Sequence, residues 1–222
     1  MKKELVVMTN PKSNISESIR TIRTNLQFSS VGKKVKTIFV TSSVPGEGKS
    51  FISSNLALTF AQTDKKTLII DCDMRRGRVH TIFGLKASRG LSNLLIDDIT
   101  EEFKHYIVKS DIPNLYILTR GTVPPNPSEL LTSEGMETLL NLLEKIFDYI
   151  VLDGVPTNGL PDALIMSRRV DKVVIVASMK YTPMDLLVNT KKSLEKVNAD
   201  IAGVVINKVP KKSSDYYASY YE

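Results

Sequence analysis

A short glycine-containing segment, Ser43–Ser50, has the composition of a phosphate-binding loop. It reads Ser-Val-Pro-Gly-Glu-Gly-Lys-Ser and matches the pattern G-x-x-x-x-G-K-[ST], with a serine in the first glycine position. Backbone N–H groups of small residues can turn toward phosphate oxygens, Lys49 would reach the β- and γ-phosphates, and the Ser50 hydroxyl would ligate Mg²⁺. The alternative is a glycine-containing turn that only caps the following helix. We predict a site for a nucleoside triphosphate and Mg²⁺, formed by Val44, Pro45, Gly46, Glu47, Gly48, Lys49, Ser50 and Phe51.

Three aspartates follow two apolar runs elsewhere in the chain. Asp71 and Asp73 come directly after Leu-Ile-Ile, and Asp153 ends the run Tyr-Ile-Val-Leu. A phosphate-binding loop needs carboxylates that hold magnesium and handle the attacking nucleophile. The alternative for each aspartate is a helix or turn cap. We expect all three to lie beside the phosphate loop, although their spacing leaves open which one is the base and which ones hold the metal.

The elements that would position these residues alternate between strand and helix. Such an order, with strands that are apolar throughout, predicts a doubly wound, mainly parallel α/β sheet whose strands are buried on both faces. Ligands would then bind at the carboxyl ends of the strands. The expected strands are Thr37–Thr41, Thr67–Ile70, Leu115–Leu118, Tyr149–Leu152, Lys172–Ala177 and Ala202–Ile206. The expected helices are Glu17–Gln27, Lys49–Gln62, Glu134–Lys145 and Pro183–Val197.

Composition sets outer limits on the function. The chain has 222 residues, a net charge of +6 and a single cysteine, Cys72, which excludes an internal disulfide and fits a reducing cytosol. Its apolar runs are far shorter than a membrane-spanning helix, and we expect a soluble cytoplasmic protein. The lysines are scattered without a recognition motif, so we expect no nucleic-acid partner. Because Cys72 stands between two carboxylates, we expect a packed side chain and not a reactive thiol.

The C-terminal end differs from the rest of the chain. We divide the sequence into a nucleotide-binding domain, residues 1–207, and a polar, mobile tail, residues 208–222. Half of the eight tyrosines of the chain lie in this tail: Tyr216, Tyr217, Tyr220 and Tyr221.

Taken together, these segments resemble the bacterial tyrosine kinases (BY-kinases). The resemblance rests on the phosphate loop, on Asp-Cys-Asp-Met-Arg at Asp71–Arg75, on Tyr-Ile-Val-Leu-Asp at Tyr149–Asp153, on Pro-Pro-Asn-Pro-Ser-Glu-Leu-Leu at Pro124–Leu131, and on the tyrosine-rich tail. Members of this family are P-loop proteins related to the cell-division and partitioning ATPases. Without a spanning segment, the chain is similar to the split Gram-positive form, the cytoplasmic kinase of capsule or exopolysaccharide clusters.

The resemblance implies roles for individual residues. Lys49, Asp71, Asp73 and Asp153 would be catalytic, and Ser50, Asp73 and Asp153 would hold Mg²⁺. We favour Asp71 as the base that orients the tyrosine hydroxyl. Asn207 would lie near the adenine of ATP.

It also implies partners. The pattern Glu17, Arg20, Arg23 would assemble a homo-oligomeric ring, although the same spacing is typical of any solvated helix face. The tail tyrosines would be autophosphorylated, and other proteins would be tyrosine substrates. A transmembrane activator, a polysaccharide co-polymerase, would recruit the kinase to the inner face of the membrane through its cytoplasmic end. Phe51, Leu58 and Phe60 are candidates for its docking face, but core packing also explains them.

Three positions depart from the family pattern. Gly154-Val155 stands where Thr-Pro is usual after the third aspartate, which suggests a different loop shape near the γ-phosphate. Gly77 stands where proline is common. Val44 occupies the place where the partitioning ATPases carry an additional loop lysine, which argues against that branch of the superfamily. A P-loop ATPase switch without kinase activity is the alternative function. The tyrosine-rich tail favours the kinase.

Overall fold

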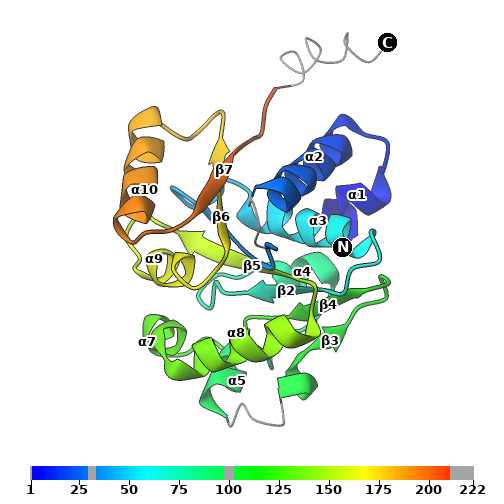
Figure 1. The fold of residues 1–222 in the computed structure, drawn as a ribbon, viewed down its shortest axis with the longest axis vertical. Helices are drawn as coiled ribbons and strands as arrows, with labels where there is room; N and C mark the ends of the chain where they lie inside the picture. The colour runs from blue at the N-terminus through cyan, green and yellow to red at the C-terminus, as the bar shows by residue number, and fades with distance from the viewer. Residues whose placement is uncertain (1, 30–33, 98–102, 211–222) are drawn as a thin grey trace.

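One seven-stranded sheet organises the molecule, in the order β3-β4-β2-β5-β1-β6-β7 (Figure 1). The computed structural model describes residues 2–29, 34–97 and 103–210. Six strands run parallel, and the short β3 pairs antiparallel with β4 at one edge. The strands are β1 Thr37–Ser42, β2 Thr67–Asp71, β3 Val108–Lys109, β4 Leu115–Leu118, β5 Tyr149–Pro156, β6 Lys172–Ser178 and β7 Ile201–Asn207.

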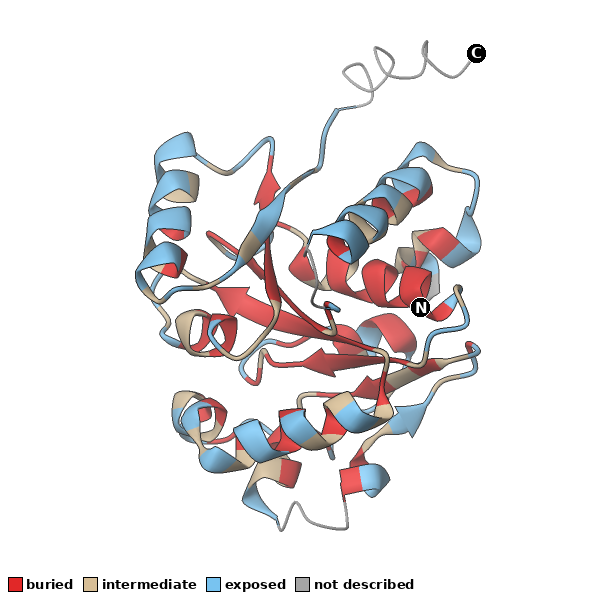
Figure 2. Cartoon of the chain, viewed as in Figure 1, coloured by how far each residue is buried: buried red, intermediate tan, exposed pale blue. Residues whose placement is uncertain are grey.

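Helices cover both faces of the sheet, as Figure 2 shows by the buried strands between them. One apolar core joins the sheet to α1–α4, and the other joins it to α5 and α7–α10. On the first face the helices are α1 Val6–Thr9, α2 Asn14–Phe28, α3 Lys49–Ala61 and α4 Val79–Phe83. On the second face they are α5 Leu91–Ile96, α7 Pro127–Thr132, α8 Glu134–Ile146, α9 Asp162–Ser167 and α10 Met184–Lys196. Two 3₁₀ helices, η1 Lys2–Glu4 and η2 Phe103–Tyr106, complete the described elements.

The strand order reverses at β1. The chain leaves β1 toward β2, which lies beyond β5 on one side, whereas β6 and β7 continue the sheet on the other side. Loops at the carboxyl ends of strands separate at such a reversal, and ligands of doubly wound folds bind in that crevice. The loop after β1 is the segment Ser43–Gly48, so the topology places the predicted phosphate loop at the switch point.

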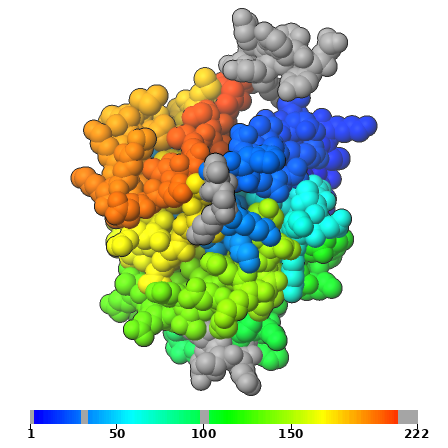
Figure 3. Space-filling model, viewed as in Figure 1, coloured from blue at the N-terminus to red at the C-terminus, as the bar shows by residue number. Residues whose placement is uncertain are grey.

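All the expected strands and helices are present, and the doubly wound fold is confirmed. The expectation of burial on both faces is wrong for β7, because this strand lies at an edge of the sheet and Val204 and Ile206 are exposed. Figure 3 shows β7 in orange-red beside the blue α2, with a small groove between them. The antiparallel β3 escaped prediction, since two residues, Val108 and Lys109, are too short a run to show a period.

The N-terminal helices pack against α3 and bury it. Ile19 and Leu26 of α2 are buried, and the side chain of Asn55 on α3 accepts a hydrogen bond from the Val7 N–H (3.1 Å) and donates one to the Glu4 carbonyl (2.8 Å). Because α3 is enclosed between α2 and the sheet, its first turn is held firmly beneath the phosphate loop.

Candidate active site

Two glycines shape the loop between β1 and α3. Gly46 and Gly48 have φ angles of +83° and +103°, a region that favours glycine. Alternating backbone conformations of this kind direct successive N–H groups into one concave nest that suits phosphate oxygens. At Gly48 a side chain is also excluded by space, because a Cβ would lie 2.1 Å from Nδ2 of Asn207.

The buried carboxylate of Glu47 ties the loop together from within. This side chain is only 1% exposed, and its Oε2 accepts a hydrogen bond from the Val44 N–H at 2.9 Å. Its Oε1 accepts from the Thr182 hydroxyl and from the Ser178 N–H at the end of β6. The loop is thereby fixed to β6 before any ligand arrives.

The end of β7 holds the outer side of the same loop. Asn207 donates from Nδ2 to the Glu47 carbonyl at 2.9 Å, and Lys208 donates from Nζ to the Gly46 carbonyl at 2.6 Å. Both carbonyls are therefore occupied by side chains at the end of β7. Ser43, in the first glycine position, is held in turn by the Thr190 hydroxyl at 2.9 Å.

Asp71 and Asp153 are register partners at the ends of neighbouring strands, β2 and β5. Both side chains are fully buried. Oδ1 of Asp153 accepts a hydrogen bond from the Ser53 hydroxyl at 2.8 Å, whereas its Oδ2 has no hydrogen-bond partner within the described part of the chain. Burial raises the pKa of Asp153 to about 6. The Ser50 hydroxyl, the positive charge of Lys49 and the hydrogen bond from Ser53 act in the opposite direction and lower this pKa, because they favour the ionised form.

Asp71 has the more strongly altered environment of the two. Burial, and then the charges of Asp153 and Asp73, raise its pKa well above the ordinary value. Its Oδ2 accepts from the Val79 N–H at 3.1 Å, but Oδ1 has no hydrogen-bond partner among residues 2–29, 34–97 and 103–210. Gly77 makes room for this carboxylate, since a Cβ there would lie 2.2 Å from Oδ1. The glycine that departs from the family pattern thus lies against a predicted catalytic group.

Asp73 and Lys49 complete the constellation. Oδ1 of Asp73 accepts from the N–H groups of Arg75 (3.2 Å) and Arg76 (2.8 Å), which closes a turn after β2. Lys49 begins α3 and is 8% exposed. Burial lowers its pKa, against the attraction of Asp153, Asp73 and Glu47, which raises it. A cation and three carboxylates therefore meet beside the phosphate loop.

An open cleft of about 450 Å³ lies over this constellation. Three arginines that follow Asp73 line it, and sequence reasoning gave them no role although the run Arg-Arg-Gly-Arg was visible. The lining residues are Glu4, Pro45, Gly46, Gly48, Lys49, Ser50, Phe51, Asp73, Arg75, Arg76, Arg78, Val155, Pro156, Asn158 and Leu160. Sequence reasoning also missed Ser53, which holds Asp153 from the second turn of α3.

The donor set fits a magnesium ion shared with a nucleotide. Mg²⁺ prefers hard oxygen ligands and is usually bound through one or two carboxylates together with phosphates and water. Ser50 supplies a hydroxyl, Asp73 a carboxylate at the cleft, and Asp153 a carboxylate oxygen without a hydrogen-bond partner in the described ranges. These groups come from α3, the turn after β2 and β5, which meet at the carboxyl edge of the sheet.

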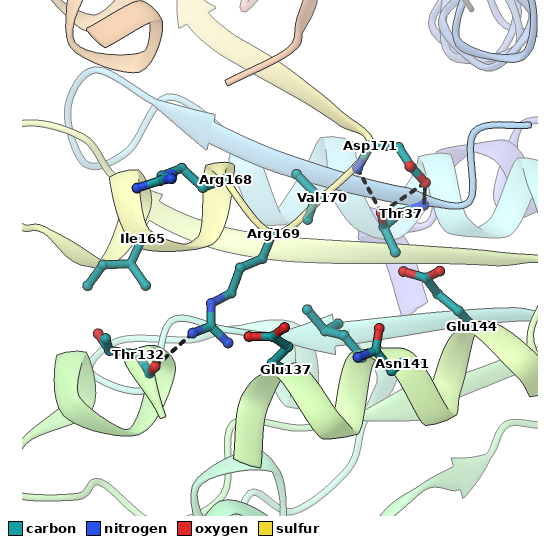
Figure 4. Close-up of a pocket in the computed structure, with 11 residues that line it drawn as sticks. Thr37, Thr132, Glu137, Asn141, Glu144, Ile165, Arg168, Arg169, Val170 and Asp171 are labelled. Carbon is teal, nitrogen blue, oxygen red and sulfur yellow. Dashed lines mark hydrogen bonds between the residues drawn. The ribbon is translucent and has the colours of Figure 1, made fainter. Parts of the chain in front are cut away.

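A larger hollow of about 610 Å³ lies at the opposite edge of the sheet, between α8 and the segment before β6 (Figure 4). Its polar groups serve the fold. Arg169 donates to the carbonyls of Thr132 (2.7 Å) and Ser133 (3.2 Å) at the end of α7, and Asp171 accepts from the Thr37 N–H at 3.0 Å. This hollow therefore has a structural explanation and lies away from the phosphate loop.

The remaining predicted residues lie elsewhere. Glu17 and Arg20 form an ion pair on the surface of α2 (2.5 Å), whereas Arg23 turns inward and donates to the Thr59 carbonyl at 3.1 Å. Leu58 and Phe60 are buried, which confirms core packing, and only Phe51 reaches the cleft. Cys72 is also buried, and burial raises the pKa of its thiol, as expected for a packed side chain. The four tail tyrosines lie outside the described residues.

The fold and the loop define a P-loop nucleotide-binding domain. A family model for an AAA domain matches residues 35–203. The septum site-determining protein MinD of Pyrococcus horikoshii, solved with Mg-ADP, shares the fold with a TM-score of 0.64 at 19% identity, over 81% of this chain and 76% of that one. At this identity the likeness shows a shared fold.

Much closer similarities place the chain within this class. It is 41% identical to the protein CapB of Staphylococcus aureus over 98% of this chain and 95% of CapB. It is 38% identical to the tyrosine-protein kinase YwqD of Bacillus subtilis over 97% of this chain and 91% of YwqD. The crystal structure of the chimerical protein CapA2B2 superposes with a TM-score of 0.89 at 39% identity, covering 94% of this chain and 91% of that one. The chain belongs to the bacterial tyrosine-protein kinase family.

Among the described helices, none combines the length and the apolar character that crossing a membrane requires.

Proposed function

We propose that the chain transfers the γ-phosphoryl group of ATP to tyrosine hydroxyls, and that the tail tyrosines Tyr216, Tyr217, Tyr220 and Tyr221 are its first acceptors. The observation that supports this most is the buried carboxyl group of Asp71 beside the phosphate loop, with one oxygen free of protein hydrogen bonds in the described residues. A proton acceptor in this position suits a hydroxyl nucleophile.

Phosphoryl transfer depends mainly on positioning and charge neutralisation. The N–H groups of the loop and the ammonium of Lys49 would bind the β- and γ-phosphates, and Asn207 would lie near the adenine. Ser50, Asp73 and Asp153 would hold Mg²⁺, which supplies positive charge to the phosphate oxygens when bound. Because the loop is already fixed through Glu47, little reorganisation is needed at the moment of reaction.

Asp71 is the proposed base. An unperturbed tyrosine hydroxyl has a pKa near 10, so it needs a partner that accepts its proton as the new bond forms. Burial and the neighbouring carboxylates raise the pKa of Asp71, which makes it a better proton acceptor than an exposed aspartate. Oδ1 would take the proton, while the Val79 N–H keeps Oδ2 in place.

The wider role follows from family membership. We propose that the chain regulates the synthesis and export of capsular or extracellular polysaccharide. It would be a cytoplasmic kinase, recruited to the inner face of the membrane by the cytoplasmic end of a transmembrane activator. We also propose a homo-oligomeric ring assembled through Glu17, Arg20 and Arg23, in which the tail of one copy enters the site of the next. Residues 1–207 would form the kinase domain and residues 208–222 its substrate tail.

Intact mass of the purified chain, before and after incubation with ATP and Mg²⁺, tests the activity. We expect stepwise mass gains that map to the C-terminal peptide, with and without a candidate activator fragment. Lys49→Met should abolish them and leave the thermal unfolding midpoint within a few degrees of the unmodified chain. A Lys49→Met protein that still labels its tail would contradict the assignment of Lys49. ATP consumption without a mass gain in any condition would favour the ATPase switch.

A further inference from the structure

The three arginines on the rim of the cleft differ in what they contact. Nε of Arg75 lies 3.4 Å from Oδ2 of Asp162, a carboxyl group that is 1% exposed. Arg78 pairs with the Glu4 carboxylate at 3.0 Å. The guanidinium of Arg76 has no hydrogen bond or ion pair within residues 2–29, 34–97 and 103–210, although its backbone N–H is bound by Asp73. Arg76 is the rim arginine that remains available to a ligand.

A hydrogen bond fixes the backbone of Arg76 at the rim of the cleft. Its N–H donates to Oδ1 of Asp73 at 2.8 Å, in the turn that directly follows β2. The backbone of Arg76 is therefore held beside Asp73, and both residues line the cleft together with Lys49, the proposed phosphate-binding cation. From this rim the guanidinium can contact a group bound in the cleft without entering the buried pair of carboxylates, Asp71 and Asp153.

The proposed acceptor sequence offers a matching charge. The tail reads Ser-Ser-Asp-Tyr-Tyr-Ala-Ser-Tyr-Tyr-Glu, so Asp215 precedes the first pair of tyrosines and Glu222 follows the second. Each pair of acceptor tyrosines thus has a carboxylate as its direct neighbour. Arginine binds carboxylates and phosphates through two parallel hydrogen bonds, so a phosphorylated neighbour would satisfy it as well.

From these observations we propose that Arg76 binds the acidic group next to the acceptor tyrosine, and that the preferred substrates are tyrosines flanked by a carboxylate or a phosphotyrosine. The inference rests on the proposed kinase function and adds its substrate class. It also gives an order of events: the first phosphate on a tyrosine pair becomes the acidic neighbour that Arg76 holds while the second tyrosine reacts.

Kinetics with two peptides test this substrate preference. One peptide has the sequence of residues 213–222, and the other carries Asp215→Asn and Glu222→Gln. Because the guanidinium lies at an open rim, we expect Arg76→Ala to raise the KM of the acidic peptide about fivefold to tenfold. The KM of the neutral peptide and the KM of ATP should change less than twofold. Arg76→Lys should recover part of the loss, since it keeps the charge but not the two-bonded geometry.

Arg78→Ala is the matched control. It removes the same type of side chain from the same rim, but this guanidinium is already paired with Glu4. We expect it to leave the preference for the acidic peptide in place. An equal effect of Arg76→Ala on both peptides, or an increase confined to the KM of ATP, would overturn the inference; the second result would assign Arg76 to the nucleotide phosphates.

Binding separates this inference from the kinase assignment. Fluorescence anisotropy of the labelled acidic peptide, with the full chain and ADP, needs no phosphoryl transfer. Peptide affinity that depends on Arg76 without any transfer would support the recognition site and contradict the kinase function. Transfer with an affinity that ignores both Arg76 and the peptide charge would support the kinase and overturn the recognition site.

Discussion

Burial shifts the pKa of individual charged residues in the site. Asp71 and Asp153 lie side by side in the register of β2 and β5, and loss of hydration raises the pKa of both carboxyl groups. The same loss of hydration lowers the pKa of Lys49. Ionised groups in such surroundings are costly unless a ligand of opposite charge compensates them. These groups therefore lower the free energy of unfolding of the ligand-free chain, and a bound nucleotide and cation would raise it again.

This cost predicts a pH dependence for the stability of the ligand-free chain. The pKa of Asp153 is about 6, above its ordinary value in an unfolded chain, so the protonated form is favoured in the fold. The stabilising contribution of protonated Asp153 to the free energy of unfolding is therefore complete below about pH 4 and is lost as the pH rises through about 6. A shift of this size corresponds to a loss on the order of 3 kcal/mol in the free energy of unfolding. Asp153→Asn should remove this loss, as urea unfolding between pH 4 and 8 would measure.

At each pH, the free energy of unfolding of Asp153→Asn is compared with that of the unmodified chain, because other carboxylates also titrate at low pH and affect both proteins. Asp185→Asn changes an exposed carboxyl group at the start of α10 and serves as the control. Parallel curves for Asp153→Asn and the unmodified chain would contradict the pKa assigned to this group.

At the scale of elements, the close approach of β5 to β1 explains an unusual glycine. We expected Gly154 to alter a loop near the γ-phosphate, but β5 continues through Pro156, so Gly154 lies within the strand. A Cβ at this position would lie 2.3 Å from the ring of Phe39 on β1. The aromatic ring therefore occupies the space that a larger residue after Asp153 would need.

Gly154→Ala should consequently destabilise the fold, by about 1–3 kcal/mol, because overpacking forces the ring or the strand to move. The double variant Phe39→Leu, Gly154→Ala should recover part of that loss, since the smaller side chain vacates the contact. Thermal or urea unfolding of both single variants and the double variant measures the coupling. Strictly additive effects would show that the ring of Phe39 is not what excludes the methyl group.

Local sequence patterns predicted some features of this structure and missed others. The strands could be predicted because buried parallel strands are continuous apolar runs, and the phosphate loop because its residue types follow from backbone geometry. The exposure of β7 could not, since an edge strand and a central strand have the same composition. The hydrogen bond from Thr182 to Glu47, which fixes the phosphate loop, could not be predicted either, because the two residues are more than a hundred positions apart in the sequence. These features depend on packing between residues far apart in the sequence, which a local pattern of apolar residues does not show.

At the scale of the whole molecule, α2 lies beside β7, with a small groove between them (Figure 3). The groove is lined by Ile22, Asn25 and Leu26 of α2, whereas the Glu17–Arg20 pair lies nearer the start of this helix. Ion pairs between exposed side chains contribute little to the stability of a monomer. Loss of the Glu17–Arg20 pair should therefore leave folding intact and act on contacts between copies.

Light scattering of the purified chain in two phosphorylation states tests this arrangement. Each phosphate adds roughly −1.5 to −2 charges to the tail, which should repel it from the aspartates of a neighbouring site. We expect the unphosphorylated chain to form the larger particle and the phosphorylated chain the smaller one. The variant Glu17→Ala, Arg20→Ala should remain small in both states with an unchanged unfolding midpoint. Lys191→Ala, Glu195→Ala removes a more exposed ion pair, on α10, and should behave like the unmodified chain. Equal particle sizes in both states would refute the role of the tail, and a small particle for both double variants would refute the role of α2.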